Sequence, residues 1–139
     1  MIRDCSGLTL MELLACLAIA GVLAAAALPL HREAMLRARR ADARDALLAL
    51  QALQERYYFA HGRYAHGLEQ LGAPARRRSP QGLYQLEVWA QRAGQGFIAS
   101  ASPLRDGPQA RDATCQELTL DDTGRRGARG VGDARRCWG

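Results

Sequence analysis

An apolar segment near the start of the chain constrains its architecture more than any other feature. From Leu8 to Leu30 the sequence reads LTLMELLACLAIAGVLAAAALPL, with Glu12 as its single charge. A helix of these 23 residues spans about 34 Å, enough to cross the roughly 30 Å hydrocarbon core of a bilayer. We therefore expect a membrane helix followed by one small domain, because 139 residues leave no room for two.

A cleavable secretory signal fits this segment poorly. Such signals have an apolar stretch of about 7–15 residues that ends at a small-residue cleavage site. Here the alanines of AAAALP lie inside a longer stretch. The lone Arg3 before the segment favours a cytoplasmic N-terminus. On these residues alone, a plain single-pass anchor remains the alternative.

Glu12 is the exception within the apolar segment. A carboxylate in such a run is costly and usually functional. It lies about 6 Å along the helix from Leu8, so it falls near the membrane interface. The simpler interpretation is a carboxylate that reaches the lipid headgroups. The functional one is a carboxylate that pairs with an amine one helical turn away.

The segment SGLTLMELL resembles the class III signal of type IV prepilins. In that signal, a short polar leader ends in glycine, and glutamate is the fifth residue of the mature helix. The resemblance implies that a prepilin peptidase cleaves between Gly7 and Leu8 and N-methylates Leu8, and that Glu12 guides subunit assembly. Residues 1–7 are then a leader peptide and residues 8–30 a transmembrane and assembly helix. Leu8 departs from the phenylalanine that is usual at this position.

Two residues are expected to interrupt the apolar helix. Pro29 removes one backbone hydrogen bond and favours a kink, and Gly21 lowers the helix propensity eight residues earlier. In similar pilins the segment between such residues loosens when the subunit enters the filament, and the resemblance implies the same here. The alternative is that Pro29 only marks the membrane exit.

Residues 31–139 are predicted to form a periplasmic head that begins with an amphipathic helix to about Phe59. Apolar residues recur at helical spacing and predict one buried stripe. The stripe consists of Leu36, Ala43, Leu47, Leu50, Leu53 and Tyr57. Charged residues are expected to cover the remaining surface of this helix, namely Arg37, Arg39, Arg40, Asp42, Arg44 and Asp45.

Beyond the helix, residues 65–80 are predicted to be a loop with a short helical turn at residues 68–71. Alternating apolar residues then predict three strands. They are Tyr84, Leu86, Val88 and Ala90, then Phe97, Ala99 and Ala101, then Leu118 and Leu120. Three strands need a partner for their apolar face, and the helix supplies it. The expected class is α+β: a long N-terminal α-helix packed on a small antiparallel β-sheet, the type IV pilin fold.

Cysteine placement indicates the compartment. Cys5 lies in the leader and Cys16 in the membrane span, which leaves Cys115 and Cys137 as an even pair in the C-terminal region. In an oxidising periplasm this pair would form a disulfide. A metal site is the rival use, but no histidine lies near the pair in sequence. We expect neither a metal nor a cofactor.

Later motifs resemble those of PilE-type minor pilins. Three lie at the helix exit: Gln54 to Tyr58, Gly62 to Tyr64, and Leu68 to Gly72. Three more lie near the C-terminal cysteines: Arg111 to Leu120, Gly124 to Gly127, and Cys137 with Trp138. The resemblance implies as partners other pilin subunits, the prepilin peptidase, an inner-membrane platform protein and a motor ATPase. It also implies a single-pass subunit in the inner membrane that moves to an extracellular pilus.

The sequence offers no support for an enzyme. His31, His61 and His66 are scattered, and no HExxH, paired CxxC, Walker A or GxGxxG motif is present. The first hypothesis is a structural subunit of a type IV pilus, a minor pilin. The alternative is a pseudopilin of a type II secretion system. With a net charge of +5, a third hypothesis is a filament-borne DNA receptor. Its candidate arginines are Arg125, Arg126, Arg129, Arg135 and Arg136.

Overall fold

The computed structural model describes residues 9–72 and 75–139, so the expected cleavage position at Gly7 and Leu8 lies outside the described residues. The chain divides into two units, residues 1–35 and 36–139. In chain order the elements are α1 (Leu10–His61), η1 (Leu68–Leu71), β1 (Tyr84–Gln91), η2 (Arg92–Gly94), β2 (Gly96–Pro103), β3 (Glu117–Asp121), β4 (Arg126–Arg129) and α2 (Ala134–Trp138).

The helix α1 continues through both Gly21 and Pro29 as one helix. The loosening of the segment between them on entry into a filament stays a prediction. A proline inside a helix removes one hydrogen bond, but the neighbouring alanines and leucines have the highest helix propensities. One missing bond among such residues does not end the helix. The helix extends to His61, two residues beyond the expected end.

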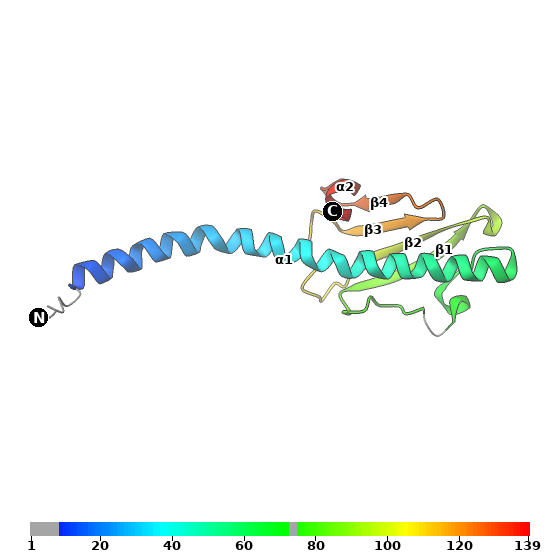
Figure 1. Ribbon diagram of the computed structural model, residues 1–139, viewed down its shortest axis with the longest axis horizontal. Coiled ribbons are helices and arrows are strands. Elements are labelled where there is room, and N and C mark those ends of the chain that lie inside the picture. Colours follow the sequence, from blue (N-terminus) through cyan, green and yellow to red (C-terminus); the bar gives the residue numbers. More distant parts are fainter. Residues whose placement is uncertain (1–8, 73–74) are drawn as a thin grey trace, which may run out of the picture. The chain divides into compact units, whose positions relative to one another are not determined.

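In the head, the second part of α1 covers one face of a four-stranded antiparallel sheet whose strand order is β1-β2-β3-β4 (Figure 1). Val88 pairs with Ala99, and Ala99 pairs with Leu120, so these three side chains share the face toward the helix. Across from them, Leu47 and Leu50 of α1 are buried. The three expected strands are therefore confirmed. Of the expected stripe, Ala43, Leu47 and Leu50 are buried and Leu53 packs half-buried against the core, whereas Leu36 and Tyr57 are half-buried outside it.

A glutamine fixes the point where the chain leaves α1. The buried Gln54 side chain donates a 2.9 Å hydrogen bond to the carbonyl of Ala65 and accepts one of 2.8 Å from the Ala65 N–H. This pairing satisfies both backbone groups of a buried loop residue, as a strand neighbour would. The QERYY motif thus contributes a structural residue rather than a surface one.

Two charged residues of α1 contradict the expected pattern. Arg40 is 3 % exposed and Asp42 is 2 % exposed, although both were expected on the outer surface. The buried face of α1 is therefore wider than its apolar residues alone indicate. Each of these two charged side chains meets polar partners from the rest of the head. A buried charge is tolerated only with such partners.

The C-terminal region is more ordered than the sequence suggested. β4 pairs with β3, and α2 follows it. Between them the chain passes tightly over the preceding loop, where Val131 N–H donates to the carbonyl of Ala113 at 3.1 Å. Gly130 makes this passage possible: its φ is +139°, and a Cβ there would lie 2.5 Å from the Thr114 carbonyl oxygen.

Candidate functional site

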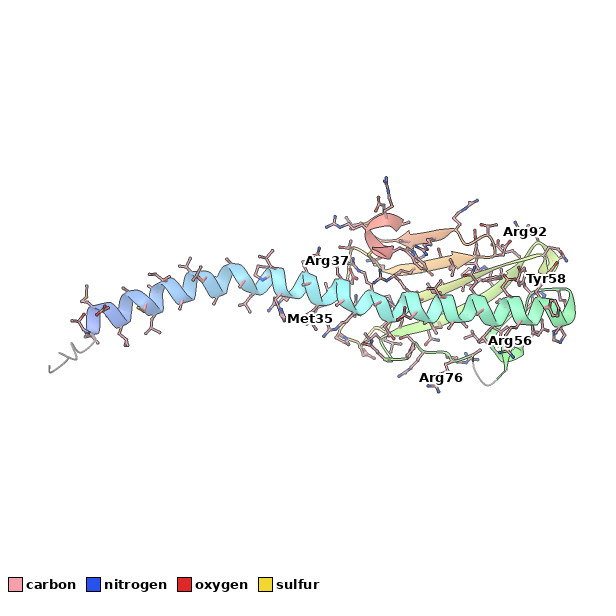
Figure 2. The ribbon with its side chains drawn as sticks, in the orientation of Figure 1. Met35, Arg37, Arg56, Tyr58, Arg76 and Arg92 are labelled. Carbon is pink, nitrogen blue, oxygen red and sulfur yellow. A yellow bond between two sulfur atoms is a disulfide. The ribbon has the colours of Figure 1, made fainter. Side chains whose placement is uncertain are left out.

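The first candidate site is the apolar part of α1. Among the described residues, α1 is the one helix long and apolar enough to cross a membrane, and its apolar stretch is not buried anywhere within the chain. Leu10 is 75 % exposed, Leu17 61 % and Leu30 70 %. Side chains extend from this part of the helix in all directions (Figure 2). Such a surface requires lipid or other apolar helices around it.

Glu12 occupies a defined position at the start of this helix. Thr9 precedes the first helical residue, and its hydroxyl accepts a 3.3 Å hydrogen bond from the Glu12 N–H. Threonine before the helix and glutamate three residues later form the pattern of a capping box. Negative charge in the first turn is also favoured by the helix dipole. The Thr9–Glu12 spacing is a signal that the sequence analysis did not use.

The C-terminal cysteines form the second candidate site. Cys115 and Cys137 are joined by a disulfide with a Cα–Cα distance of 5.7 Å, which links the two cysteines expected to pair. Next to Cys137, the Trp138 indole N–H donates a 2.9 Å hydrogen bond to the carbonyl of Gly127 in β4. At the start of α2, Asp133 accepts from the backbone N–H of Arg136 at 2.8 Å and caps the helix. The cap, indole and disulfide together hold α2 against β4.

A buried ion pair connects this C-terminal region to α1. Arg40 forms two parallel hydrogen bonds with the carboxylate of Asp112, at 2.7 and 2.8 Å. The same carboxylate accepts from Gln109 Nε2 at 2.9 Å and from the backbone N–H of Cys115 at 3.2 Å. Planar two-point geometry and additional donors are what make a buried ion pair stable. This cluster therefore determines where the disulfide lies relative to the helix.

Asp42 forms a second polar anchor on the same helix. Its carboxylate accepts from the Ser79 hydroxyl and, at 2.9 Å, from the backbone N–H of Gln81. Ser79 Oγ in turn accepts from the backbone N–H of Tyr84 at 3.0 Å. The anchor holds the loop that leads into β1. Sequence reasoning missed both Asp42 and Arg40, because an isolated charge within an amphipathic helix gives no sign of a distant partner.

For two buried polar atoms of this core, the Tyr84 hydroxyl and Gln109 Oε1, no hydrogen-bond partner is found among the residues that the structure describes. Burial raises the pKa of Tyr84 above its ordinary value, and the nearby Asp112 carboxylate adds to the effect. The hydroxyl therefore stays protonated and contributes a buried polar atom without an identified bond.

The arginines proposed to contact DNA lie around β4 and α2. All five are exposed: Arg125, Arg126, Arg129, Arg135 and Arg136. Arg129 lies 3.2 Å from Glu117, and Arg125 lies 3.9 Å from Asp121. In the described part of the chain, no ion pair is found for the other three. Their charge is therefore available to an external anion.

A pocket lies beside these arginines. It has a volume of about 420 Å³ and is lined by Arg126, Ala134, Arg135, Trp138 and Gly139. The Arg126 guanidinium lies 5.2 Å from the centre of the Trp138 ring, within cation–π distance.

The pKa of Asp121, at the end of β3, is lowered. Partial burial opposes ionisation of Asp121, but hydrogen bonds from Thr123 and from the backbone N–H of Arg125 outweigh this effect.

A metal-binding function finds no geometric support in the described residues. No group of three or more His, Cys, Asp and Glu side chains gathers there in a way that could hold an ion. Of the histidines considered above, His61 stacks on Tyr57 at the exposed end of α1.

Comparison with known proteins gives two family matches. The model of the type IV minor pilin ComP, described as a DNA uptake sequence receptor, matches residues 29–119. The model of the prokaryotic N-terminal methylation motif matches residues 2–28. No match is found among curated proteins. The minor-pilin match favours the pilus over the secretion-system alternative.

The fold is also found in a solved pilin structure. The non-core minor pilin PilV of Neisseria meningitidis is 23 % identical, with a TM-score of 0.54 over 69 % of this chain and 88 % of that chain. A type IV pilin from Shewanella oneidensis is 25 % identical, with a TM-score of 0.49 over 66 % of this chain and 89 % of that chain. Because the minor-pilin model covers well over half of the sequence, directly after a methylation motif, this chain belongs to the ComP family of type IV minor pilins.

Proposed function

We propose that this minor pilin is made as a precursor, cleaved between Gly7 and Leu8, and methylated on Leu8 by a prepilin peptidase. Residues 8–30 hold it in the inner membrane with the head in the periplasm. A platform protein and a motor ATPase then move it into an extracellular pilus. The single observation that carries this proposal is the exposed apolar surface that α1 presents from Leu10 to Leu30.

Assembly transfers that surface from lipid into a bundle of similar helices. Lipid tails and apolar side chains are about equally hydrophobic, so the transfer itself gains little, and packing and polar pairs decide which neighbours fit. In the mature chain the amine of Leu8 lies four residues before Glu12 in the sequence. We infer that Glu12 pairs with the terminal amine of a neighbouring subunit, because an unpaired charge in such a bundle is expensive. The pair would select the axial register of the subunit.

The hydrogen bond from the Glu12 backbone N–H to the Thr9 hydroxyl stays in every variant at position 12. Substitutions at Glu12 therefore separate the pairing from a second capping bond, which the side chain of residue 12 would return to the Thr9 backbone. Glu12→Gln keeps a side chain that can make this second bond but removes the charge, and Glu12→Asp keeps the charge. Glu12→Val removes both the charge and the side-chain acceptor. Cys16→Val is the matched control within the same apolar stretch. The measurement is the fraction of subunit in sheared pili relative to the inner membrane.

The charge hypothesis predicts that Glu12→Val and Glu12→Gln both lower this ratio at least about tenfold, corresponding to about 1.4 kcal/mol. Glu12→Asp should retain part of it, and Cys16→Val should behave as wild type. Because insertion needs only apolarity, all variants should reach the membrane and be cleaved. Wild-type incorporation of Glu12→Gln would show that the residue acts by capping and that the pairing mechanism is wrong.

DNA binding by the head is a second candidate function. It is favoured by two observations: the matched family is described as a DNA uptake sequence receptor, and exposed arginines without an identified ion pair flank a pocket at α2. Guanidinium groups bind phosphate with two parallel hydrogen bonds, and they also stack on bases. We infer that Arg126 and Arg135 contact the DNA backbone.

The salt dependence of binding tests this inference. Full-length protein in detergent is titrated with a labelled DNA duplex at several salt concentrations. Loss of two phosphate contacts in Arg126→Gln/Arg135→Gln should reduce the slope of log K against log salt by about 2. The charge-matched control is Arg56→Gln/Arg63→Gln, at the far end of α1, where Arg56 is labelled in Figure 2. Equal slopes for the two double variants would refute this site.

A further inference from the structure

The strand β1 lies at one edge of the sheet, with β4 at the other (Figure 1). Just before β1, the Leu104 N–H donates to the carbonyl of Leu83 at 3.0 Å. Because backbone bonding alternates along a strand, the odd-numbered residues of β1 are those that bond to β2. The even-numbered residue Tyr84 pairs with Pro103, which has no N–H to give. The N–H and C=O groups of the even-numbered residues therefore point out of the sheet.

The first of these outward groups are already occupied. Ser79 N–H donates to the carbonyl of Tyr84 at 3.0 Å, and Leu86 N–H donates to the carbonyl of Arg77 at 2.8 Å. Residues 77–79 thus lie antiparallel along the beginning of β1, where Arg78 and Gln85 form an isolated β-bridge. For the outward N–H groups of Val88 and Ala90, no partner is found among the described residues. The edge of β1 is covered over its first half and open over its second.

A groove of about 300 Å³ runs along β1 and includes the open part of its edge at Val88. One wall is β1 from Gln85 to Trp89, the opposite wall is Gly67 to Glu69 at the start of η1, and Arg77 also lines the groove. A hydrogen-bonded strand lies about 4.8 Å from its neighbour. Because the groove has a second wall at η1, a single extended chain fits it better than a whole sheet from another copy.

We propose that this groove binds one extended peptide segment of a partner protein, which adds a strand to the edge of β1. The backbone of the segment would bond to the outward groups of Val88 and Ala90, as in strand addition to other sheet edges. The side chains opposite Glu87 and Trp89 would lie on the outer face of the sheet with them. This site is independent of filament entry through α1 and of the arginines around β4.

Charge indicates which segment fits. Glu69 and Glu87 are both exposed at the groove, and no ion pair is found for either carboxylate in the described part of the chain. Trp89 is 39 % exposed. A basic side chain opposite Glu87 gains an opposite-charge cross-strand pair, and an arginine over Trp89 gains a cation–π contact. Arg77, the one basic residue of the lining, limits this preference to the half of the groove away from it.

The probe is the labelled peptide acetyl-Thr-Arg-Val-Arg-Thr-amide, which presents arginines to Glu87 and Trp89 in either strand direction. Fluorescence anisotropy with the full-length protein in detergent should give saturable binding with a Kd below about 1 mM. N-methylation of the central valine removes one backbone donor and keeps every side chain, and it should weaken binding at least about tenfold. Glu87→Gln should weaken it about threefold, and the control Asp106→Asn should not.

Hydrogen exchange supplies an internal control within β1. When the probe binds, the outward amides of Val88 and Ala90 should exchange more slowly, while the amide of Trp89, already bonded to β2, should not change. Absence of saturable binding would overturn the proposal. Equal affinity for the N-methylated peptide, or uniform slowing of exchange along β1, would overturn it as well, since neither result involves the strand edge.

Discussion

Removing Arg40 tests whether the buried ion pair holds the C-terminal region of the head. The side chains of Arg40 and Asp112 are 3 % and 0 % exposed, and two hydrogen bonds join them. Arg40→Met leaves the Asp112 carboxylate buried with only Gln109 and the Cys115 N–H as donors. Breaking a buried pair in this way costs about 3–5 kcal/mol. For a head of this size, that loss lowers the Tm by more than about 10 °C.

The double variant is the more informative one. Arg40→Met/Asp112→Asn leaves neither charge of this pair buried, and the asparagine oxygen can still accept from the Cys115 N–H. It should therefore be more stable than Arg40→Met alone, although it carries one more substitution. Arg105→Met, at an exposed position, is the control and should change stability by less than about 0.5 kcal/mol.

Thermal unfolding of the full-length chain in detergent, followed by circular dichroism, measures these differences. The fluorescence of the buried Trp138 gives a second signal, from the C-terminal region that the ion pair holds in place. A cost below about 1 kcal/mol for Arg40→Met would refute the reasoning. The reasoning would also be refuted if the double variant lost as much stability as Arg40→Met and Asp112→Asn lose together when made singly. The two charges would then act independently.

Three further predictions concern the head. Cys137→Ser opens a disulfide with a sequence separation of 22, and in the chain-entropy model it should cost about 3 kcal/mol; a melting temperature equal to that of the wild type would contradict this. Tyr84→Phe removes a buried hydroxyl without an identified partner and should leave the head at least as stable, as urea unfolding can show; a clear loss would reveal a bond to that hydroxyl. Because the fold lowers the pKa of Asp121, its stabilising effect is present above about pH 4 and is lost as the pH falls through the folded value. The stability difference between wild type and Asp121→Asn should therefore shrink in acid, and a difference that grows there would have the wrong sign.

Most of the fold could be predicted because its signals are local. The stripe containing Leu47 and Leu50, and the alternation in β1 and β2, follow directly from helix and strand periodicity. β4 could not be predicted in this way. Its sequence RGAR has no apolar alternation, and the strand exists because β3 offers an edge and Trp138 bonds to Gly127. A strand of this kind depends on contacts that are distant in sequence.

The same distinction applies to the candidate sites. Glu12 stands out locally, as a lone charge in an apolar run, and Cys115 and Cys137 stand out as the pair left outside the membrane. Arg40 and Asp42 carry no local signal, because a charge on an amphipathic helix normally faces water. Only the fold shows that Arg40 meets Asp112, 72 residues away.

The most direct test of the account is the mass of this subunit in sheared pili, compared with that in the inner membrane. The account predicts a pilus form that begins at Leu8 and carries a methyl group on its amine. It also predicts a membrane precursor that retains Met1 when the prepilin peptidase is inactive. Absence of the subunit from sheared pili, or a pilus form that still begins at Met1, would contradict the proposal that this chain is processed and assembled through its N-terminal helix.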